Sequence, residues 1–191
     1  MATNLKSLSI LFISLAFLFS ACNEDNILCT NNRPITSQEH LVDISPLDQF
    51  PKILDILKKY PNLQVRRLIS DEIATIIHCN VFYKKLKVFD ENYLLVQGTR
   101  FPSFSEQGHA SFDTIPISLI PKLNVNDAIR IAKHTPEFER GCTQSTLGIY
   151  DKNIRISGST PEFKLCWQIQ PDSDFHRVII DANDGTVYEH N

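Results

Sequence analysis

The feature that most constrains this 191-residue chain is an apolar run near its start, because it decides which part can fold as a globular body. From Leu8 to Ala21 every residue is apolar except three serines, and Lys6 precedes the run. A membrane-spanning helix needs about 20 consecutive apolar residues, so this run is short for one. It ends in the small residues that a signal peptidase requires at its cleavage site. We therefore predict a cleaved targeting segment at residues 1–21.

Cys22 follows this segment directly, and the stretch "LFSAC" that ends at Cys22 resembles the lipobox of bacterial lipoproteins. In that family a diacylglyceryl group is attached to the cysteine sulfur, and cleavage leaves the cysteine as the first residue. Phe19 stands where the family commonly has leucine. Acyl chains such as palmitate on Cys22 would hold the protein on a bilayer, since each buried methylene contributes about 0.8 kcal/mol. An uncleaved membrane anchor and an ordinary signal peptide with a chance cysteine stay open as alternatives.

The residues after Cys22 predict a flexible tether over residues 22–44, because "CNEDN" and "CTNNRP" are rich in turn formers and have few side chains to bury. Glu24 and Asp25 resemble the acidic export signal found after the cysteine in some lipoproteins of the Bacteroidetes group. A solvated linker explains the same two residues equally well. The resemblance implies a bacterial envelope lipoprotein, on the outer membrane and on its periplasmic or surface face.

Length and net charge limit the number of domains and the kinds of function that this chain can have. Without residues 1–21 the chain has 170 residues (191 − 21), enough for one large domain or two small ones. Lys6 is the only charged residue in the leader, so its removal takes the net charge from −3 to −4. This mild negative charge argues against nucleic-acid binding, for which a basic patch is expected. The short basic pairs Arg66-Arg67 and Lys84-Lys85 are predicted to lie on solvated strand faces.

Residues 45–101 are predicted to form a helix followed by antiparallel strands. Ser45 can cap the helix and Pro46 suits its first turn, although the start could instead slip to Gln49. Its apolar face consists of residues at helical spacing, namely Phe50, Ile53, Leu54 and Leu57. Strand-like runs follow, broken by "DE" and "DEN" turns and by a bend at the lysine pair: "LQVRRLI", "EIATIIHCNVFYKKLKVFD" and "NYLLVQGTRF".

The second half of the chain repeats this plan after a connection. Residues 102–122 carry Pro, Gly and Ser without a sustained period, so they are predicted to be an irregular connection and a candidate binding loop. Residues 123–191 then begin with a helix that Asn124 can cap. Its predicted apolar stripe consists of Val125, Ala128, Ile129 and Ala132. "DANDGTVY" predicts a hairpin in which Gly185 takes a positive φ, because the turn needs one.

Three segments of this second half resemble the PepSY domain: the helix "LNVNDAIRIAKH", the strand "LCWQIQ" and the closing "RVIIDANDGTVYEH". Asp181-Ala182 and Gly185-Thr186-Val187 match the family's terminal hairpin. In the first half, "VFYKKLKVFDENYLLVQG" resembles the strand-turn-strand of the FTP domain, which often precedes PepSY in propeptides of thermolysin-like proteases. No protease follows, so a propeptide acting in cis is not expected. These resemblances imply an α+β fold of two successive units, each with one helix followed by an antiparallel sheet.

Four cysteines follow Cys22, and an even number outside the cytoplasm suggests disulfides. We predict that Cys142 pairs with Cys166, because both belong to one predicted sheet unit. Cys29 would then pair with Cys79 and fix the N-terminal arm. The first bridge would close a loop of about 25 residues, worth roughly 3.5 kcal/mol. Three pairings are possible in principle, and four buried free thiols are the alternative.

The sequence carries no motif for catalysis. There is no HExxH helix, no GxSxG elbow and no phosphate-binding glycine loop, so we predict no enzymatic activity and no cofactor. No metal site is expected either, since the cysteines form no CxxC pair. Of the six scattered histidines only His109, in the irregular connection, merits a functional test. Trp167 is predicted to be a core residue rather than a ligand platform.

These observations lead to three hypotheses about function. The first is a noncatalytic, envelope-anchored module that binds a protein or peptide through a sheet edge. PepSY domains are associated with protease inhibition, so the resemblance implies that such a module restrains a protease. The alternative is a structural lipoprotein that assembles an envelope complex without a small ligand. A weaker alternative is a hydrolase that uses His109 and Asp113.

Overall fold

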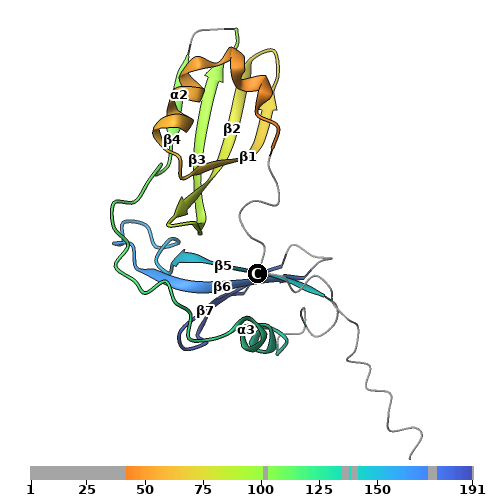
Figure 1. The fold of residues 1–191 in the computed structure, drawn as a ribbon, viewed down its shortest axis with the longest axis vertical. Coiled ribbons are helices and arrows are strands. Elements are labelled where there is room, and N and C mark those ends of the chain that lie inside the picture. The colour runs from red at the N-terminus through yellow and green to blue at the C-terminus, as the bar shows by residue number, and fades with distance from the viewer. Residues whose placement is uncertain (1–41, 101–102, 135–137, 139–141, 172–175, 191) are drawn as a thin grey trace, which may run out of the picture. The chain divides into compact units, whose positions relative to one another are not determined.

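The structure is a computed structural model that describes residues 42–100, 103–134, 138, 142–171 and 176–190. These residues contain a short 3-10 helix and two α-helices, η1 (Ser45–Gln49), α2 (Pro51–Lys59) and α3 (Val125–Ala132). The strands, drawn in Figure 1, are β1 (Leu63–Ser70), β2 (Ala74–Tyr83), β3 (Leu86–Gly98), β4 (Phe104–Gln107), β5 (Thr143–Asp151), β6 (Phe163–Pro171), β7 (Val178–Asp181) and β8 (Val187–His190).

All eight described strands belong to one mixed sheet, in the order β1-β2-β3-β5-β6-β7-β8, with β4 paired to β3 beside this path. The predicted fold, two successive units that each join one helix to its own antiparallel sheet, is therefore wrong. Strands β3 and β5 pair in parallel, Lys87 opposite Gly148 and Val88 opposite Ile149. Those partners are 61 positions apart in the sequence (148 − 87). Parallel strands are joined by a long crossover and not by a tight turn, so no local turn motif could predict this pairing.

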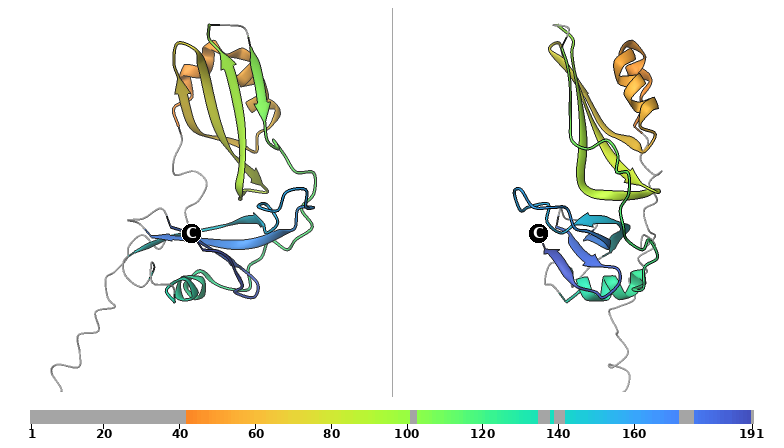
Figure 2. Two further views of the ribbon diagram at one scale, coloured as in Figure 1. Left: turned by 180° about the vertical axis from the view of Figure 1, so that it is seen from behind. Right: turned by 90° about the vertical axis from the view of Figure 1, so that its left-hand side faces the viewer.

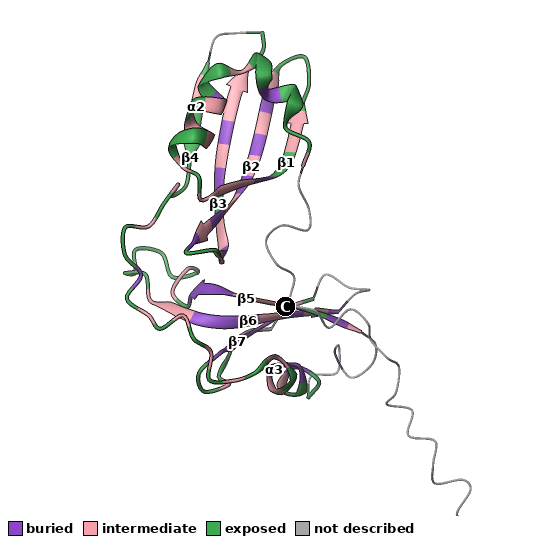
Figure 3. Cartoon of the chain, viewed as in Figure 1, coloured by how far each residue is buried: buried purple, intermediate pink, exposed green. Residues whose placement is uncertain are grey.

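At one end of the sheet, β1 to β4, the helices η1 and α2 cover one face (Figure 2). Strand β2 alternates strictly between buried and half-buried residues, as expected when one face of a sheet is packed and the other is not (Figure 3). The packed face forms one apolar cluster with the helices: Leu47, Ile53, Val65, Ile77, Cys79, Val81, Tyr93 and Leu95. This end of the sheet therefore has its core on the helix side.

The predicted helix in this region exists, but its start differs from the prediction. The α-helix begins at Pro51, after Phe50, and no side chain caps it. Ser45 is not a cap, because its hydroxyl donates to Asp43 instead. Proline suits the first helical position, since the N–H that it lacks would have no partner there. The apolar residue Leu47, fully buried in η1, anchors the approach to the helix.

The two lysines at 84 and 85 form the turn between β2 and β3, rather than a bend on a strand face. Tyr83 pairs with Leu86 across them, so the loop has two residues. Both lysines have positive φ, 47° and 72°. Two-residue hairpin turns of this kind favour Asn-Gly, because most side chains resist the left-handed region. The absence of Asn or Gly explains why the sequence did not indicate a turn here.

The turn predicted at "DEN" is instead an irregularity inside the long strand β3. Asp90 takes the left-handed conformation, with φ 66°. The register against β2 shifts here, since Asn80 pairs with Asn92 whereas Phe82 pairs with Lys87. Extra residues in one strand bend it and re-aim its side chains. The part of β3 before the irregularity pairs with β5, and the part after it pairs with β4.

At the other end of the sheet, β5 to β8, helix α3 covers one face. The predicted cap is confirmed, because the Asn124 side chain accepts a hydrogen bond from the Asp127 N–H at 3.0 Å. The predicted apolar stripe is also confirmed, and it packs against Leu165, Trp167, Ile169, Val178 and Ile180. The closing hairpin forms as predicted, and Gly185 has φ 80°.

The predicted irregular connection holds one element, β4, and then runs without helix or strand to Asn124. It contributes to the core, since Ile115 is only 3% exposed and joins a cluster with Tyr83, Val88 and Ile149. That cluster lies where β3 pairs with β5. The connection therefore helps to hold the two ends of the sheet together.

Candidate functional site

The strands β1, β2 and β3 have a second face, opposite η1 and α2, that no described helix covers (Figure 2). Strand pairing places its side chains in three rows across the sheet. All of them are half-buried or exposed. We call this surface the open face, and its rows are Ile69–Ile76–Val96, Arg67–His78–Leu94 and Gln64–Asn80–Asn92.

The open face changes character along the strands. Its row at Ile76 is aliphatic, and its row at Asn80 consists of amides. The Oδ1 atom of Asn80 is buried and has no hydrogen-bond partner. An unpaired buried acceptor costs roughly 1–3 kcal/mol. The open face therefore joins an apolar strip to a row of amide side chains.

A basic cluster lies beside the amide row. Arg66 is exposed where the β1 register shifts, and the next residue, Arg67, is also exposed. Burial lowers the pKa of Lys87, and the positive charges of Arg66 and Arg177 lower it further, whereas Asp90 opposes the shift. Asp90 itself accepts from Arg177 at 2.9 and 2.8 Å. We call Arg66, Arg67, Lys87 and Arg177 the basic cluster.

This cluster was not predicted from the sequence. Arg66-Arg67 forms an isolated pair there, because Lys87 and Arg177 are distant in the chain. One signal could have indicated it: the stretch from Ile73 to Phe89 holds three lysines and no acidic residue. Sequence could not show, however, that Arg177 would lie beside that stretch.

The two buried carboxylates near β5 to β8 are used by the fold. Asp181 accepts from the Tyr188 hydroxyl at 2.7 Å and from the Asn183 N–H at 2.7 Å. Burial, followed by the hydrogen bond to this carboxylate, raises the pKa of Tyr188. Asp151 accepts from two backbone N–H groups, those of Asn153 and Glu162. Both acids therefore stabilise turns, and neither is available as a general acid or base.

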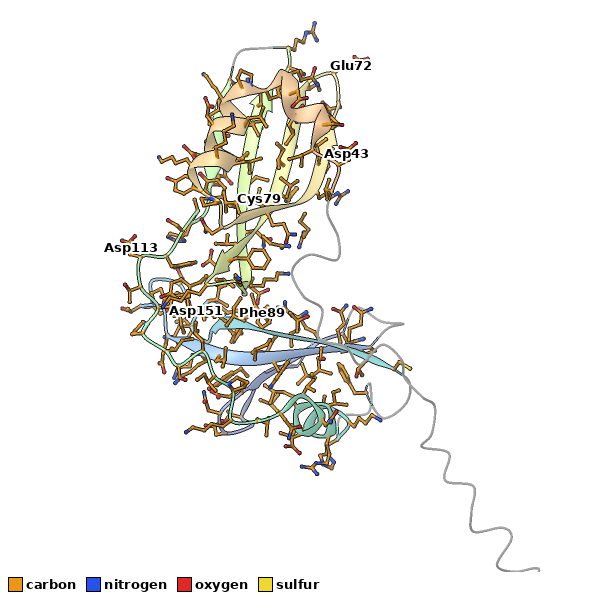
Figure 4. All side chains as sticks on the ribbon, viewed as in Figure 1. Asp43, Glu72, Cys79, Phe89, Asp113 and Asp151 are labelled. Carbon is orange, nitrogen blue, oxygen red and sulfur yellow. The ribbon has the colours of Figure 1, made fainter. Side chains whose placement is uncertain are left out.

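The predicted pairings of Cys142 with Cys166 and of Cys29 with Cys79 are wrong, because Cys79 and Cys166 are free thiols. Each is fully buried in a central strand, Cys79 against α2 (Figure 4) and Cys166 in a cluster with Phe89 and Tyr150. Burial raises the pKa of the Cys79 thiol to about 11. Cys142 takes part in a disulfide, and neither of the free thiols can be its partner. Cys29 and the predicted lipid-attachment residue Cys22 lie outside the described residues.

The structure does not bring His109 and Asp113 together as a reactive pair. The His109 side chain is 75% exposed, and its Nδ1 lies 3.8 Å from a Glu91 carboxylate oxygen. Its ring lies near Phe112, whereas Asp113 is an exposed residue of the connection (Figure 4). Trp167 is a core residue as predicted, and its Nε1–H donates to the Leu123 carbonyl at 2.9 Å.

Two further features are absent from the part of the chain that the structure describes. Among those residues, no three His, Cys, Asp or Glu side chains are grouped so that they could hold a metal ion. No helix within them has the length and apolar character needed to cross a bilayer. The targeting segment and the tether lie outside that part.

Comparisons with known proteins add little. No protein-family model matches the chain, and no curated protein matches it. Among solved structures it is similar to the Bacillus megaterium YpeB C-terminal domain, with 15% identity, a TM-score of 0.42, and coverage of 80% of this chain and 68% of that one. A similarity at this level carries no argument about fold or function.

Proposed function

We propose that this chain is a noncatalytic module that is anchored to the bacterial envelope through acylated Cys22 and binds a protein or peptide on the open face. The observation that carries the proposal is the aliphatic part of that face, formed by Ile69, Ile76, Leu94 and Val96. These four side chains are half-buried and adjoin one another across three strands, and contiguous apolar patches on a protein surface commonly mark interaction sites.

The open face is a better binding surface than the neighbouring sheet edge. Strand β1 is terminal in the sheet, so its outer edge could in principle accept another strand. That edge, however, carries two adjacent arginines and a register shift. Charges and bulges of this kind discourage strand addition. We therefore place the partner on the open face rather than along β1.

The envelope location rests on the leader and Cys22, and a mass measurement tests it. The full chain would be produced in a bacterial host, extracted in detergent and analysed intact. We expect a chain that lacks residues 1–21 and carries added hydrocarbon mass on Cys22. A chain that retains Met1 without added mass would overturn the anchoring, but it would leave the open face as a binding surface.

Site-specific photo-crosslinking tests the binding proposal. A photoreactive side chain at position 78, in the centre of the open face, should crosslink one defined partner in the envelope. The matched control is position 55, exposed on the outer side of α2. Mass spectrometry would identify the partner and the crosslinked peptide. Equal crosslinking from both positions, or none from position 78, would contradict the proposal.

Enzyme assays address the weaker alternative. If the chain were a hydrolase that uses the exposed His109, His109→Ala and Asp113→Ala would each abolish activity on a generic ester or peptide substrate. We expect no activity above background in the unmodified chain. An activity that both variants remove would overturn the noncatalytic assignment.

A further inference from the structure

We infer that the partner on the open face is an acidic, extended polypeptide segment, and that the basic cluster selects its charge. This inference rests on the proposed function and deepens it. Two observations carry it: the distribution of charge along the chain, and the gathering of that charge beside the aliphatic part of the open face.

The charge distribution is uneven for a chain whose net charge is −3. Residues 62–70 and 73–89, which form β1, β2 and the start of β3, contain five Lys and Arg residues and no Asp or Glu. Two acids separate these stretches, but they lie in the β1–β2 turn, at the far end of the strands from Phe89, as Glu72 shows in Figure 4. The half of the open face near the β2–β3 turn therefore carries these basic residues, and the acids that follow them in β3 are Asp90 and Glu91.

Tertiary structure adds a further cation to this half. Arg177 pairs with Asp90 and so offsets the charge of that acid. Residues 62–70 and 73–91 hold five Lys and Arg side chains and two acids, Asp90 and Glu91, which is an excess of three positive charges before Arg177 is counted. An excess of like charge at a surface favours a ligand of the opposite sign and speeds its association. Carboxylates of an acidic segment are such a ligand.

The aliphatic row of the open face favours a polypeptide as the carrier of these carboxylates. In an extended segment every second side chain points to the same face. A segment that lies along the strands can therefore place apolar side chains on Ile69, Ile76 and Val96 and, further along the same face, acidic side chains beside the basic cluster.

The test uses the full chain in detergent and three fluorescent, end-capped peptides of equal length. On the face that meets the protein, each peptide carries valines at one end and, at the other end, glutamates, glutamines or lysines, with serine at every intervening position, and anisotropy reports binding. We expect the glutamate peptide to bind at least about tenfold more tightly than the glutamine peptide, and the lysine peptide not to bind. Raising the salt from about 0.05 M to about 0.5 M should remove most of the difference, because it screens the charges.

A matched pair of variants locates the effect. Arg66→Gln/Arg67→Gln should weaken binding of the glutamate peptide about tenfold. Lys52→Gln/Lys58→Gln removes the same charge from exposed positions of α2, and it should leave binding unchanged. All four side chains are exposed, so both variants are expected to fold, and equal thermal midpoints would confirm it.

Several results would overturn the inference. Equal affinity for the glutamate and glutamine peptides, or equal losses in the two variants, would show that charge does not select the partner. Displacement of the glutamate peptide by short-chain phosphatidylglycerol at lower concentration than by unlabelled peptide would favour a lipid surface. Crosslinking from position 78 would still be expected after either result, because it tests binding on the open face and not the charge of the partner. Failure of the charge inference can therefore be told apart from failure of the proposed function.

Discussion

The two ends of the sheet carry a helix each, but they hold it by different means. At the β5–β8 end, α3 begins with hydrogen bonds, since Asn124 caps it and Trp167 donates to the preceding carbonyl of Leu123. At the β1–β4 end, α2 begins without a side-chain cap, and buried Leu47 anchors its approach. The comparison teaches that hydrogen bonding or apolar burial can each fix where a helix meets a sheet.

The faces opposite the helices differ even more. At the β5–β8 end that face is filled, because Phe89, Tyr150, Cys166 and Ile179 are all nearly inaccessible. At the β1–β4 end every residue of the open face is half-buried or exposed, and none is fully buried. One end of the sheet is therefore packed on both faces, whereas at the other end no described helix covers the open face.

The largest expected effect tests whether burial holds the β1–β4 end. Leu47→Ala removes a fully buried side chain from the α2 cluster, so it should lower the free energy of unfolding by about 3–4 kcal/mol. Urea unfolding followed by circular dichroism measures it. Ile44→Ala is the control, because Ile44 is 46% exposed and its loss should cost under about 1 kcal/mol. Similar losses in both variants would contradict the proposed anchor.

The second prediction concerns the parallel pairing of β3 with β5, which connects the two ends of the sheet. A Cβ at Gly148 would meet the ring of Phe89 and lie 2.6 Å from the carbonyl oxygen of Lys87. Gly148→Ala should therefore lower the free energy of unfolding by about 2–3 kcal/mol, because backbone must shift to make room.

The matched control for the join is Gly158→Ala, also measured by urea unfolding. Gly158 has φ 76° and no atom within 4 Å of an added Cβ, so only the backbone conformation resists substitution. We expect a loss of about 1 kcal/mol there. If Gly148→Ala were no more costly than Gly158→Ala, the parallel pairing of β3 with β5 would be in doubt.

The third prediction compares wild type with Cys79→Ala as pH rises. The folded-state pKa of Cys79 is about 11, above its ordinary value of 9.0. The unfolded chain therefore loses this proton first, and the stability that the neutral thiol contributes is complete below pH 9 and declines towards pH 11. Across that window the stability advantage of wild type over Cys79→Ala should shrink by about 2 kcal/mol. An advantage that stays constant would contradict the raised pKa.

Alkylation checks the same thiols directly. Without reductant, iodoacetamide should label Cys79 and Cys166 only after the chain is unfolded, because both are fully buried. Peptide mapping by mass spectrometry reports the two sites separately. A site that stays unlabelled in the unfolded, unreduced chain would be bridged, and its assignment as a free thiol would then be wrong.

A smaller effect separates the observed cap from the predicted one. Asn124→Ala removes the side-chain acceptor for the Asp127 N–H and should cost about 1 kcal/mol. Ser45→Ala should cost less than about 0.5 kcal/mol, because the exposed Ser45 hydroxyl bonds to Asp43 and caps no helix. Thermal unfolding of both variants measures the difference. Equal losses would show that the two helix starts do not differ as described.

The smallest expected effect is a gain in stability. Lys84→Asn/Lys85→Gly replaces two residues of positive φ in the β2–β3 turn with the pair that such turns favour, so it should stabilise the fold by about 1 kcal/mol. The control, Lys52→Asn, changes an exposed residue of α2 and should give no gain. A loss of stability in the turn variant would contradict the turn geometry.

Sequence indicated much of the local structure and little of the candidate site. The apolar stripe of α3 and the hairpin at Gly185 were predicted because their signals lie within a few neighbouring residues. The turn at Lys84-Lys85 contains none of the residues that favour a tight turn, so the pairing of the flanking strands must impose the turn conformation. The open face follows from the alternation of β2, but the sequence could not show that no described helix covers its second side.

By itself the sequence determined features that depend on neighbours in the chain: the cap at Asn124, the apolar face of α2 and the turn formed by Asp181 to Gly185. Tertiary structure decided the single mixed sheet, the free state of Cys79 and Cys166, and the placement of Arg177 beside Lys87. The physical reason is the distance along the chain over which each interaction acts. Capping and periodicity act over a few residues, whereas strand pairing and charge clustering depend on which distant segments the folded core brings together.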